Sequence, residues 1–456
     1  MAKSNTKQVD MTQGPLLGKL ILFSIPIIAS SLLQLLFNAA DVIVVGNYAG
    51  ENSLAAVGST SSLINLMANL FIGISIGANV CAAQFYGAGH EDDVDKTVHT
   101  SIAFSLICGV ILIFIGLFGA GPMLRIMGSP KEVIGLAELY VRIYFTAMPA
   151  IMLYNFLAGI LRASGDTTHP LIFLTVAGVV NVILNLILVI GFRMDVAGVA
   201  IATVVSNYIS CIMLIVFLMR HQFPLKINVS RIRIDRRILK KIIRIGLPAA
   251  VQGTVFSLSN VVIQSSINSF GAVVVAGSAA AASIEGFVYV SMNSVSQSCV
   301  TFVGQNYGAG KPQRVKVVVL ECLGIATVVG LVMGNLAYFF ANPLLGIYTD
   351  SKEAIAAGTI RVFWICCPYF LCGVMDTLAG GLRGLGNSTL PMIVSLLGAC
   401  ASRLVWIATY FKYHHTEGVL FFSYPASWFL TSLVHAICLI IVYRAWVKRK
   451  AAGRPI

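Results

Sequence analysis

Charged residues are scarce in this chain. Asp, Glu, Lys and Arg make up 11% of its 456 residues, whereas hydrophobic residues make up 57%. Soluble domains carry about 25% charged residues, so most of this chain is not built to face water. Apolar runs of about 20 residues, the length that crosses a bilayer as a helix, recur along the sequence. These features predict an integral membrane protein with many spans.

Motifs for two common chemistries are missing as well. The chain has no GxxxxGK(S/T) loop for ATP and no HExxH zinc pair. Its ten cysteines include no CxxC pair, so we interpret them as packing residues, not as disulfides or metal ligands. The polar residues 1–16 give no indication of a cleavable signal peptide. We therefore expect neither an enzyme nor a cofactor, and transport would have to use an ion gradient.

The positive charges lie mostly on one side of the predicted membrane. Twelve spans are predicted, roughly at 18–45, 53–85, 97–118, 133–160, 169–191, 196–219, 239–268, 274–303, 314–341, 355–381, 389–411 and 419–444. With the N-terminus inside, cytoplasmic segments and helix ends hold 23 of the 31 Lys and Arg residues, extracellular ones hold five, and three lie within spans. This asymmetry predicts that both termini are cytoplasmic. Topology then accounts for the net charge of +13, and no nucleic-acid partner is expected.

Two decapeptides indicate an internal repeat. LRASGDTTHP at 161–170 and LRGLGNSTLP at 382–391 lie 221 positions apart, and FYGAG at 85–89 and NYGAG at 306–310 have the same offset. Both pairs fall on predicted cytoplasmic connections, and each half has six spans. Because six is even, the halves enter the membrane in the same orientation, as parallel repeats. Loop geometry accounts for most of these motifs, while Arg162 and Arg383 are candidates for ion pairs that form when the cytoplasmic side closes.

The repeat divides the chain into five predicted segments. They are a cytoplasmic N-terminal segment at 1–17, an N-lobe at 18–220, a basic linker at 221–238, a C-lobe at 239–444 and a basic cytoplasmic tail at 445–456. We interpret the linker as a topology signal that touches anionic headgroups. Prolines inside spans free a backbone carbonyl and bend the helix, so the candidate hinges, with static kinks as the alternative, are Pro26, Pro149, Pro248 and Pro368.

Polar side chains inside spans one, five and six predict an ion site. An ionisable group in a span is costly and faces the protein interior or a cavity. At a rise of about 1.5 Å per residue, Asp41, Asn185 and Thr203 lie roughly 7–12 Å from the outer ends of their spans, and Asn181 lies one turn deeper. One carboxylate among neutral oxygens suits Na⁺, or a proton carried on the carboxylate. Interhelical hydrogen bonding is the alternative for this set, which is Asp41, Asn181, Asn185 and Thr203.

Stripes of amides in spans one, seven and eight predict the wall of a central cavity. Their members recur at mostly three- to four-residue steps, and the cavity-lining candidates are Gln34, Asn38, Asn260, Gln264, Asn268, Tyr289, Asn293 and Gln297. Hydrogen bonds between helices are the alternative. Glu285 and Asp376 are candidates for ion or substrate binding in the C-lobe, although Asp376 could instead pair with Arg383.

These residues resemble the multidrug and toxic compound extrusion (MATE) family of secondary transporters. The resemblance covers about 15–445 and rests on the early IP with Asp41, on QFYGAG and QNYGAG, on the doubled LR…P phrase, and on NVILN followed by VAGVAIATVVS. It implies an all-α membrane fold of twelve helices in two V-shaped six-helix lobes around a cavity that opens alternately outward and inward. It also implies export of amphipathic, often cationic, organic compounds or drugs against Na⁺ or H⁺.

The resemblance also assigns residues. The family's N-lobe cation site falls on Asp41, Asn181, Asn185 and Thr203. The position of Asn185 is often acidic in the family, so its neutral amide leaves one carboxylate and keeps the choice between Na⁺ and H⁺ open.

Two other interpretations remain. A flippase for lipid-linked oligosaccharides, from the same superfamily, should show a cavity rich in Arg and Lys. Apart from the cytoplasmic helix ends, the only arginines of the spans are Arg142, Arg361 and Arg403, and the first two lie near the outer ends. A channel or receptor would pass ions without substrate exchange. We expect a monomer in a bacterial inner membrane, with the bilayer and a small organic molecule as its partners.

Overall fold

The chain is helical throughout the part that the structure describes. A computed structural model describes residues 9–127 and 132–453, and within them it has no strand. Ten helices in these stretches are long and apolar enough to cross a membrane, and two bent helix pairs raise the number to as many as twelve. The predicted all-α membrane fold is confirmed. Residues 1–8 of the predicted N-terminal segment and 454–456 of the predicted tail lie outside the described residues.

The first half begins with α1 and ends with α7. Its helices are α1 (Leu17–Tyr48), α2 (Glu51–Gly87), α3 (Glu91–Ile126), α4 (Ile134–Phe145), α5 (Met148–Ala163), α6 (Thr168–Asn185) and α7 (Asp195–Met219). The last turns of the fifth span are π-helical and form η1 (Leu186–Gly191). A single 3₁₀ turn, η2 (Val229–Arg231), lies in the linker that follows.

The second half repeats this order with more interruptions. Its helices are α8 (Arg236–Asn268), α9 (Ala272–Gly308), α10 (Pro312–Phe339), α11 (Ala341–Gly346), α12 (Lys352–Cys366), α13 (Phe370–Gly384), α14 (Thr389–Ser395), α15 (Ser402–Trp406) and α16 (Glu417–Ala451). Two π-helical segments, η3 (Leu396–Ala401) and η4 (Ile407–Phe411), flank α15. Here η4 begins 221 positions after η1, so this irregularity belongs to the repeat.

Both halves break a span at a proline. The pair α4 and α5 bends by 47°, and the pair α12 and α13 bends by 41°. Pro149 is the second residue of α5, and Pro368 lies between α12 and α13. A proline cannot donate the backbone hydrogen bond that would continue the helix, which explains why the two breaks occur at these positions. Pro26 and Pro248 instead lie inside the long helices α1 and α8.

Two compact units are present, and they exchange parts of their first helices. The first unit contains Val9 and Ala29–Gly246, and the second contains Asp10–Ile28 and the described residues from Leu247 onward. The division therefore cuts α1 just after Pro26 and α8 just before Pro248. Each unit thus includes the first turns of the long helix that begins the other half.

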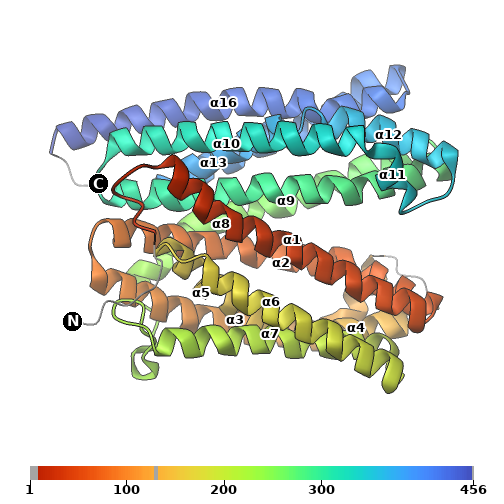
Figure 1. The fold of residues 1–456 in the computed structure, drawn as a ribbon, viewed down its shortest axis with the longest axis horizontal. Coiled ribbons are helices and arrows are strands. Elements are labelled where there is room, and N and C mark those ends of the chain that lie inside the picture. The colour runs from red at the N-terminus through yellow and green to blue at the C-terminus, as the bar shows by residue number, and fades with distance from the viewer. Residues whose placement is uncertain (1–8, 128–131, 454–456) are drawn as a thin grey trace. The chain divides into compact units, whose positions relative to one another are not determined.

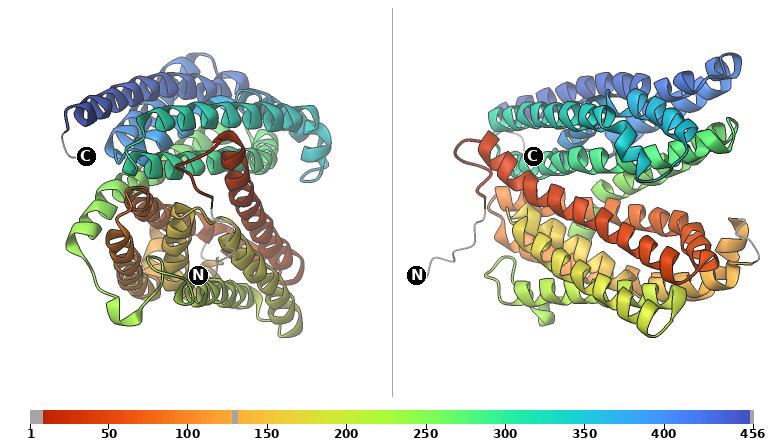
Figure 2. Two further views of the ribbon diagram at one scale, coloured as in Figure 1. Left: turned by 60° about the vertical axis from the view of Figure 1, so that its left-hand side comes forward. Right: turned by 45° about the vertical axis from the view of Figure 1, so that its right-hand side comes forward.

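Small residues let the helices of each unit pack closely (Figures 1 and 2). In the first unit α5 packs against α2 and α3, and α6 packs against α7; in the second, α9 packs against α10, α12 and α13. A Cβ atom at Gly77 of α2 would collide with the backbone carbonyl of Ile242 in α8. A Cβ atom at Gly334 of α10 would collide with that of Cys366 in α12. Close backbone approach through glycine is the usual packing device of membrane helices.

The basic linker is held against the start of α3 in the first unit. The backbone N–H of Asn228 bonds to Nε2 of His99 (3.0 Å), and the backbone N–H of Asp235 donates to Oγ1 of Thr100 (3.1 Å). These bonds give the linker a fixed course along the end of the bundle.

Candidate ion and substrate site

Three helices of the first unit bring the four predicted ion-site residues into one hydrogen-bonded cluster. Asp41 comes from α1, Asn181 and Asn185 from α6, and Thr203 from α7. The Nδ2 group of Asn185 donates to Oδ1 of Asp41 and to Oδ1 of Asn181 (3.3 Å). The Nδ2 group of Asn181 lies 3.5 Å from Oγ1 of Thr203. Spacing along the sequence therefore predicted which side chains meet.

Local helix geometry explains why these side chains share a face. Asn181 and Asn185 are four residues apart, so they lie one above the other on α6. Directly after Asn185 the helix changes to the π form of η1, an irregularity that is frequent at functional sites. On α7 the hydroxyl of Thr203 donates to the carbonyl of Val199 (3.0 Å), which leaves its oxygen lone pairs available to the cluster.

The cluster has one negative charge and spare oxygen atoms. Asn185 is fully buried and Asn181 is 5% exposed, whereas Asp41 is partly buried. No ion pair is found for Asp41 among the residues that the structure describes. Within the same stretches Oδ1 of Asn185 is buried without a hydrogen-bond partner. A buried carboxylate next to an unsatisfied carbonyl oxygen can be completed by a cation or by a proton.

Most of the predicted cavity-lining residues are exposed within their own units. Gln34 and Asn38 on α1 and the three candidates of α8 are exposed, and Tyr289 is 39% exposed. On α9 the candidates bond along the helix: Nε2 of Gln297 donates to Oδ1 of Asn293 (3.0 Å), and Nδ2 of Asn293 donates to the Tyr289 hydroxyl (3.4 Å). An exposed amide in a membrane span is costly against lipid, and the cavity-lining role of these residues stays a prediction.

The two acidic candidates of the second half have different surroundings. Glu285 is buried and forms a bidentate ion pair with Arg361, whose Nε and Nη2 lie 2.7 and 2.9 Å from the two carboxylate oxygens. Its charge is therefore neutralised within the protein. Asp376 is partly buried on α13, and its backbone carbonyl accepts a hydrogen bond from Ser296 (2.7 Å). Arg383 donates through Nη2 to Oε1 of Gln252 (2.7 Å).

One buried charge was given no role by the sequence analysis. Arg403 on α15 is 3% exposed, and its Nε donates to Oγ of Ser427 (2.8 Å). Its guanidinium lies over the rings of Tyr424 and Trp428, at 4.3 and 5.6 Å from their centroids. The signal that could have found it is its neighbour Ser402, which lies 221 positions after Asn181.

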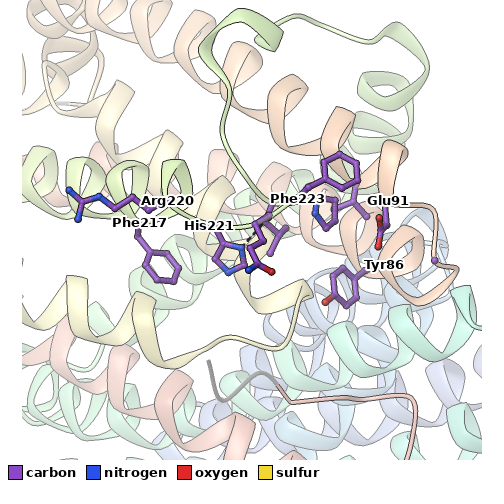
Figure 3. A pocket seen from close by; sticks show the side chains of 11 residues that line it. Tyr86, Glu91, Phe217, Arg220, His221 and Phe223 are labelled. Atoms are coloured by element: carbon purple, nitrogen blue, oxygen red, sulfur yellow. Dashed lines mark hydrogen bonds between the residues drawn. The ribbon is translucent and has the colours of Figure 1, made fainter. Parts of the chain in front are cut away.

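A pocket of about 630 Å³ lies away from the Asp41 cluster, where the linker meets the ends of α2 and α7. Figure 3 shows Phe217 of α7 and Arg220, the residue directly after this helix, on one side and Tyr86 and Glu91 on the other, with His221 between them. None of the predicted site residues lines it. No pattern in the sequence predicts this pocket, because its walls come from two separate stretches, 86–94 and 217–225.

Two repeated six-span halves with polar clusters inside the spans define a multi-pass membrane transporter of the parallel-repeat class. A family model described as MatE matches residues 26–187 and 248–407, one segment in each half. The chain therefore belongs to the MatE family, whose members are transporters and not enzymes. The resemblance seen in the sequence is confirmed.

Comparison with known proteins gives the same result. The chain is 27% identical over 431 residues to the probable multidrug resistance protein YoeA of Bacillus subtilis (strain 168), which covers 92% of this chain and 91% of that protein. It is 28% identical over 417 residues to the probable multidrug resistance protein YpnP of the same organism, covering 91% and 92%. An outward-facing multidrug resistance MATE family transporter of the MOP superfamily superposes with a TM-score of 0.91 over 98% of this chain and 100% of that one. That structure is 22% identical and shows a shared fold.

Proposed function

We propose that this transporter is an antiporter that exports amphipathic organic compounds, cationic drugs among them, against an inward flow of Na⁺ or H⁺. The family and the relatives YoeA and YpnP, both named as probable multidrug resistance proteins, support the export of drugs. The coupling step rests on a single observation. Within the described residues, Asp41 is a carboxylate in a predicted span that bonds only to neutral groups, beside an unpartnered oxygen of Asn185.

Either coupling ion fits the chemistry of this cluster. Na⁺ prefers oxygen ligands, and the carboxylate of Asp41, the amide oxygens of Asn181 and Asn185 and the hydroxyl of Thr203 are such ligands. A proton would bind to Asp41 directly and remove the negative charge that now accepts the bond from Asn185. In both cases occupation of the site changes the hydrogen bonds that join α1 to α6.

Alternating access follows if ion binding favours one arrangement of α1. This helix contributes to both units and passes from one to the other directly after Pro26. An ion bound at Asp41 would bias that helix, and the shift can be no larger than the difference in its affinity for the two arrangements. The membrane potential adds a driving force of about 2.3 kcal/mol per 100 mV for each charge that moves inward.

The remaining parts of the proposal concern location. The excess of Lys and Arg on one set of loops supports cytoplasmic termini, and the bacterial relatives support a bacterial inner membrane. We propose a monomer. The flippase alternative needs free basic groups for pyrophosphate, but Arg142 pairs with Glu138 (2.5 Å) and Arg361 pairs with Glu285. Of the three intramembrane arginines, only Arg403 has no ion pair within the described residues.

Gradient-driven export tests the proposal. The transporter is reconstituted into vesicles loaded with a fluorescent organic cation, and efflux is recorded under an inward Na⁺ gradient and then an inward H⁺ gradient. We expect one gradient to drive export and Asp41→Asn to abolish it. The matched control is Asp350→Asn, the same change at an exposed position between α11 and α12. Export that still follows the gradient in Asp41→Asn would remove Asp41 from the coupling site, and no response to either gradient would overturn the antiporter.

A further inference from the structure

The interior of the second unit holds a surplus positive charge. Two guanidinium groups, those of Arg361 and Arg403, are buried there at 7% and 3% exposure, together with one carboxylate, that of Glu285. Glu285 takes both of its hydrogen bonds from Arg361. No ion pair to Arg403 is found within residues 9–127 and 132–453. One of the two cations is therefore uncompensated.

The groups around Arg403 are neutral. Ser427 accepts from Nε, but its own hydroxyl is already donated to the carbonyl of Tyr424 (2.8 Å). The rings of Tyr424 and Trp428 supply cation–π attraction. In the described part of the chain, Nη2 of Arg403 is buried without a hydrogen-bond partner. Aromatic faces stabilise a cation only in part, and an unpartnered donor of a charged group is among the costliest features of a protein interior.

Repeat symmetry places this guanidinium at the counterpart of the ion cluster in the first unit. Ser402 and Trp406 lie 221 positions after Asn181 and Asn185, and Tyr424 lies 221 positions after Thr203. The π-helical segment η4 follows Trp406 as η1 follows Asn185. The same architecture that surrounds one negative charge in the first unit therefore surrounds one positive charge in the second.

We propose that the second unit binds a single monovalent anion at Arg403. The ligand is either a free halide ion or the carboxylate of an organic molecule. Both present one negative charge to the Nη2 donor that has no partner in the described residues. Anion binding at this position is independent of the coupling proposed for Asp41, and it can be measured without transport. It would also allow the transporter to hold the acidic end of a zwitterionic compound.

Anion-dependent stabilisation of the purified full-length protein tests this proposal. The midpoint of thermal unfolding is followed while chloride, or in a second series acetate, replaces sulfate at constant ionic strength. A ligand that binds only the folded protein raises the midpoint, and we expect a saturable rise of about 3 °C or more for the wild type. Non-specific salt effects cancel when each variant is compared with the wild type in the same buffers.

Three variants make the result specific. Arg403→Met removes the charge at similar length and should abolish the rise, whereas Arg403→Lys keeps the charge and should retain part of it. Lys412→Met removes a positive charge from an exposed position just after η4 and should respond like the wild type. Arg403→Lys also serves if Arg403→Met does not fold. Because lysine lacks the planar fork, the half-saturating anion concentration must then rise by about tenfold.

Each outcome decides the matter. A saturable effect of chloride that depends on Arg403 assigns a halide site, and an effect of acetate alone assigns a carboxylate site. Equal midpoints in chloride, acetate and sulfate for the wild type, or a rise that persists in Arg403→Met, would overturn the anion site. Neither of these results bears on whether Asp41 couples export to an ion gradient.

Discussion

Among the described residues of the first unit the partly buried carboxylate of Asp41 has no ion pair and is surrounded by amides and a hydroxyl, whereas in the second unit the buried guanidinium of Arg403 has none and is surrounded by aromatic rings. Arg403 lies on α15, the counterpart of α6, and is followed by η4 as Asn185 is followed by η1, whereas Asp41 comes from α1. The backbone irregularities have been kept while the charge has been reversed. Backbone shape depends on many residues at once, but the sign of a site can change with one or two substitutions.

The connections that carry the repeated YGAG motif show the same reversal. After FYGAG the first half continues with His90 and three acidic residues, whereas after NYGAG the second half continues with Lys311 and Arg314. Asp93 pairs with Arg237 of the linker (2.7 Å). In the second unit, Lys311 and Arg314 instead donate to backbone carbonyls of residues 11–14. Each half therefore uses the charge of its own turn to hold a different segment of chain.

The ion pairs of the two halves differ in burial, and this difference predicts the largest effect on stability. Arg361 and Glu285 have side-chain exposures of 8% and 9%. Arg361→Leu would leave Glu285 as an unpaired buried charge, and we expect a loss of about 3–5 kcal/mol in the free energy of unfolding. In the first half, where Arg142 and Glu138 are 48% and 26% exposed, Arg142→Leu should cost about 1 kcal/mol or less.

Denaturant titration of the purified variants measures both losses. The double variant in which Glu285 becomes Gln and Arg361 becomes Met should recover most of the stability, because no charge is then left unpaired. Equal losses for Arg142→Leu and Arg361→Leu would contradict the assignment of one pair as buried and the other as exposed.

A smaller effect is expected when the cluster of the first unit loses its central donor. Asn185 donates to both Asp41 and Asn181, so Asn185→Ala removes a hydrogen bond to a charged group, worth about 1.5–3 kcal/mol. We expect the half-saturating concentration of Na⁺ in vesicle efflux to rise by about tenfold or more, because the variant also loses the amide oxygen of Asn185 as a ligand. For H⁺ the half-saturating concentration should fall instead, because Asp41 loses a bond that favours its charged form. Asn207→Ala is the control, because that amide donates to the backbone carbonyl of Thr203 on its own helix (2.8 Å). An unchanged half-saturating concentration in Asn185→Ala would separate Asn185 from the ion site.

The sequence predicted the spans and the N-terminal cluster because both depend on simple periodicities. Apolar length defines the spans, and the four-residue spacing of Asn181 and Asn185 defines a helix face. The repeat also pointed to the prolines at which two spans break. Neither prediction needed knowledge of tertiary contacts.

Long-range pairing was harder to predict. Glu285 and Arg361 are 76 positions apart, and no local pattern shows that they form a buried ion pair. Arg403 looked like one of three intramembrane arginines, since the unpartnered Nη2 that it shows in the described part of the chain appears only when the neighbouring helices are in place. The exchange of helix ends between the units likewise depends on packing across the whole bundle.

The smallest predicted effect concerns residues 10–16, the segment before α1. Lys311 and Arg314, which form the basic turn after NYGAG, bond to this segment. Carbonyl groups of this segment accept hydrogen bonds from Lys19, Lys311 and Arg314. Partial burial alone would raise the pKa of Asp10, but bonds from Thr12 and the positive charges of Lys19 and Lys311 outweigh it and hold that pKa below its ordinary value. A lowered folded-state pKa contributes stability above the unfolded value of about 3.9, which is lost as the pH falls through the folded value.

Asp10→Asn should therefore lower the midpoint of thermal unfolding slightly at pH 7, and the variant and the wild type should converge as the pH falls below about 4. Asp350→Asn, at an exposed position, should show no such convergence, because its unfolding midpoint should already equal that of the wild type at pH 7. A gap between Asp10→Asn and the wild type that widens in acid would mean that Asp10 is held by something other than its negative charge. Lys311 and Arg314 would then stabilise this segment only through bonds to its backbone carbonyls. The difference in charge between the turns after FYGAG and NYGAG would have no electrostatic effect on Asp10.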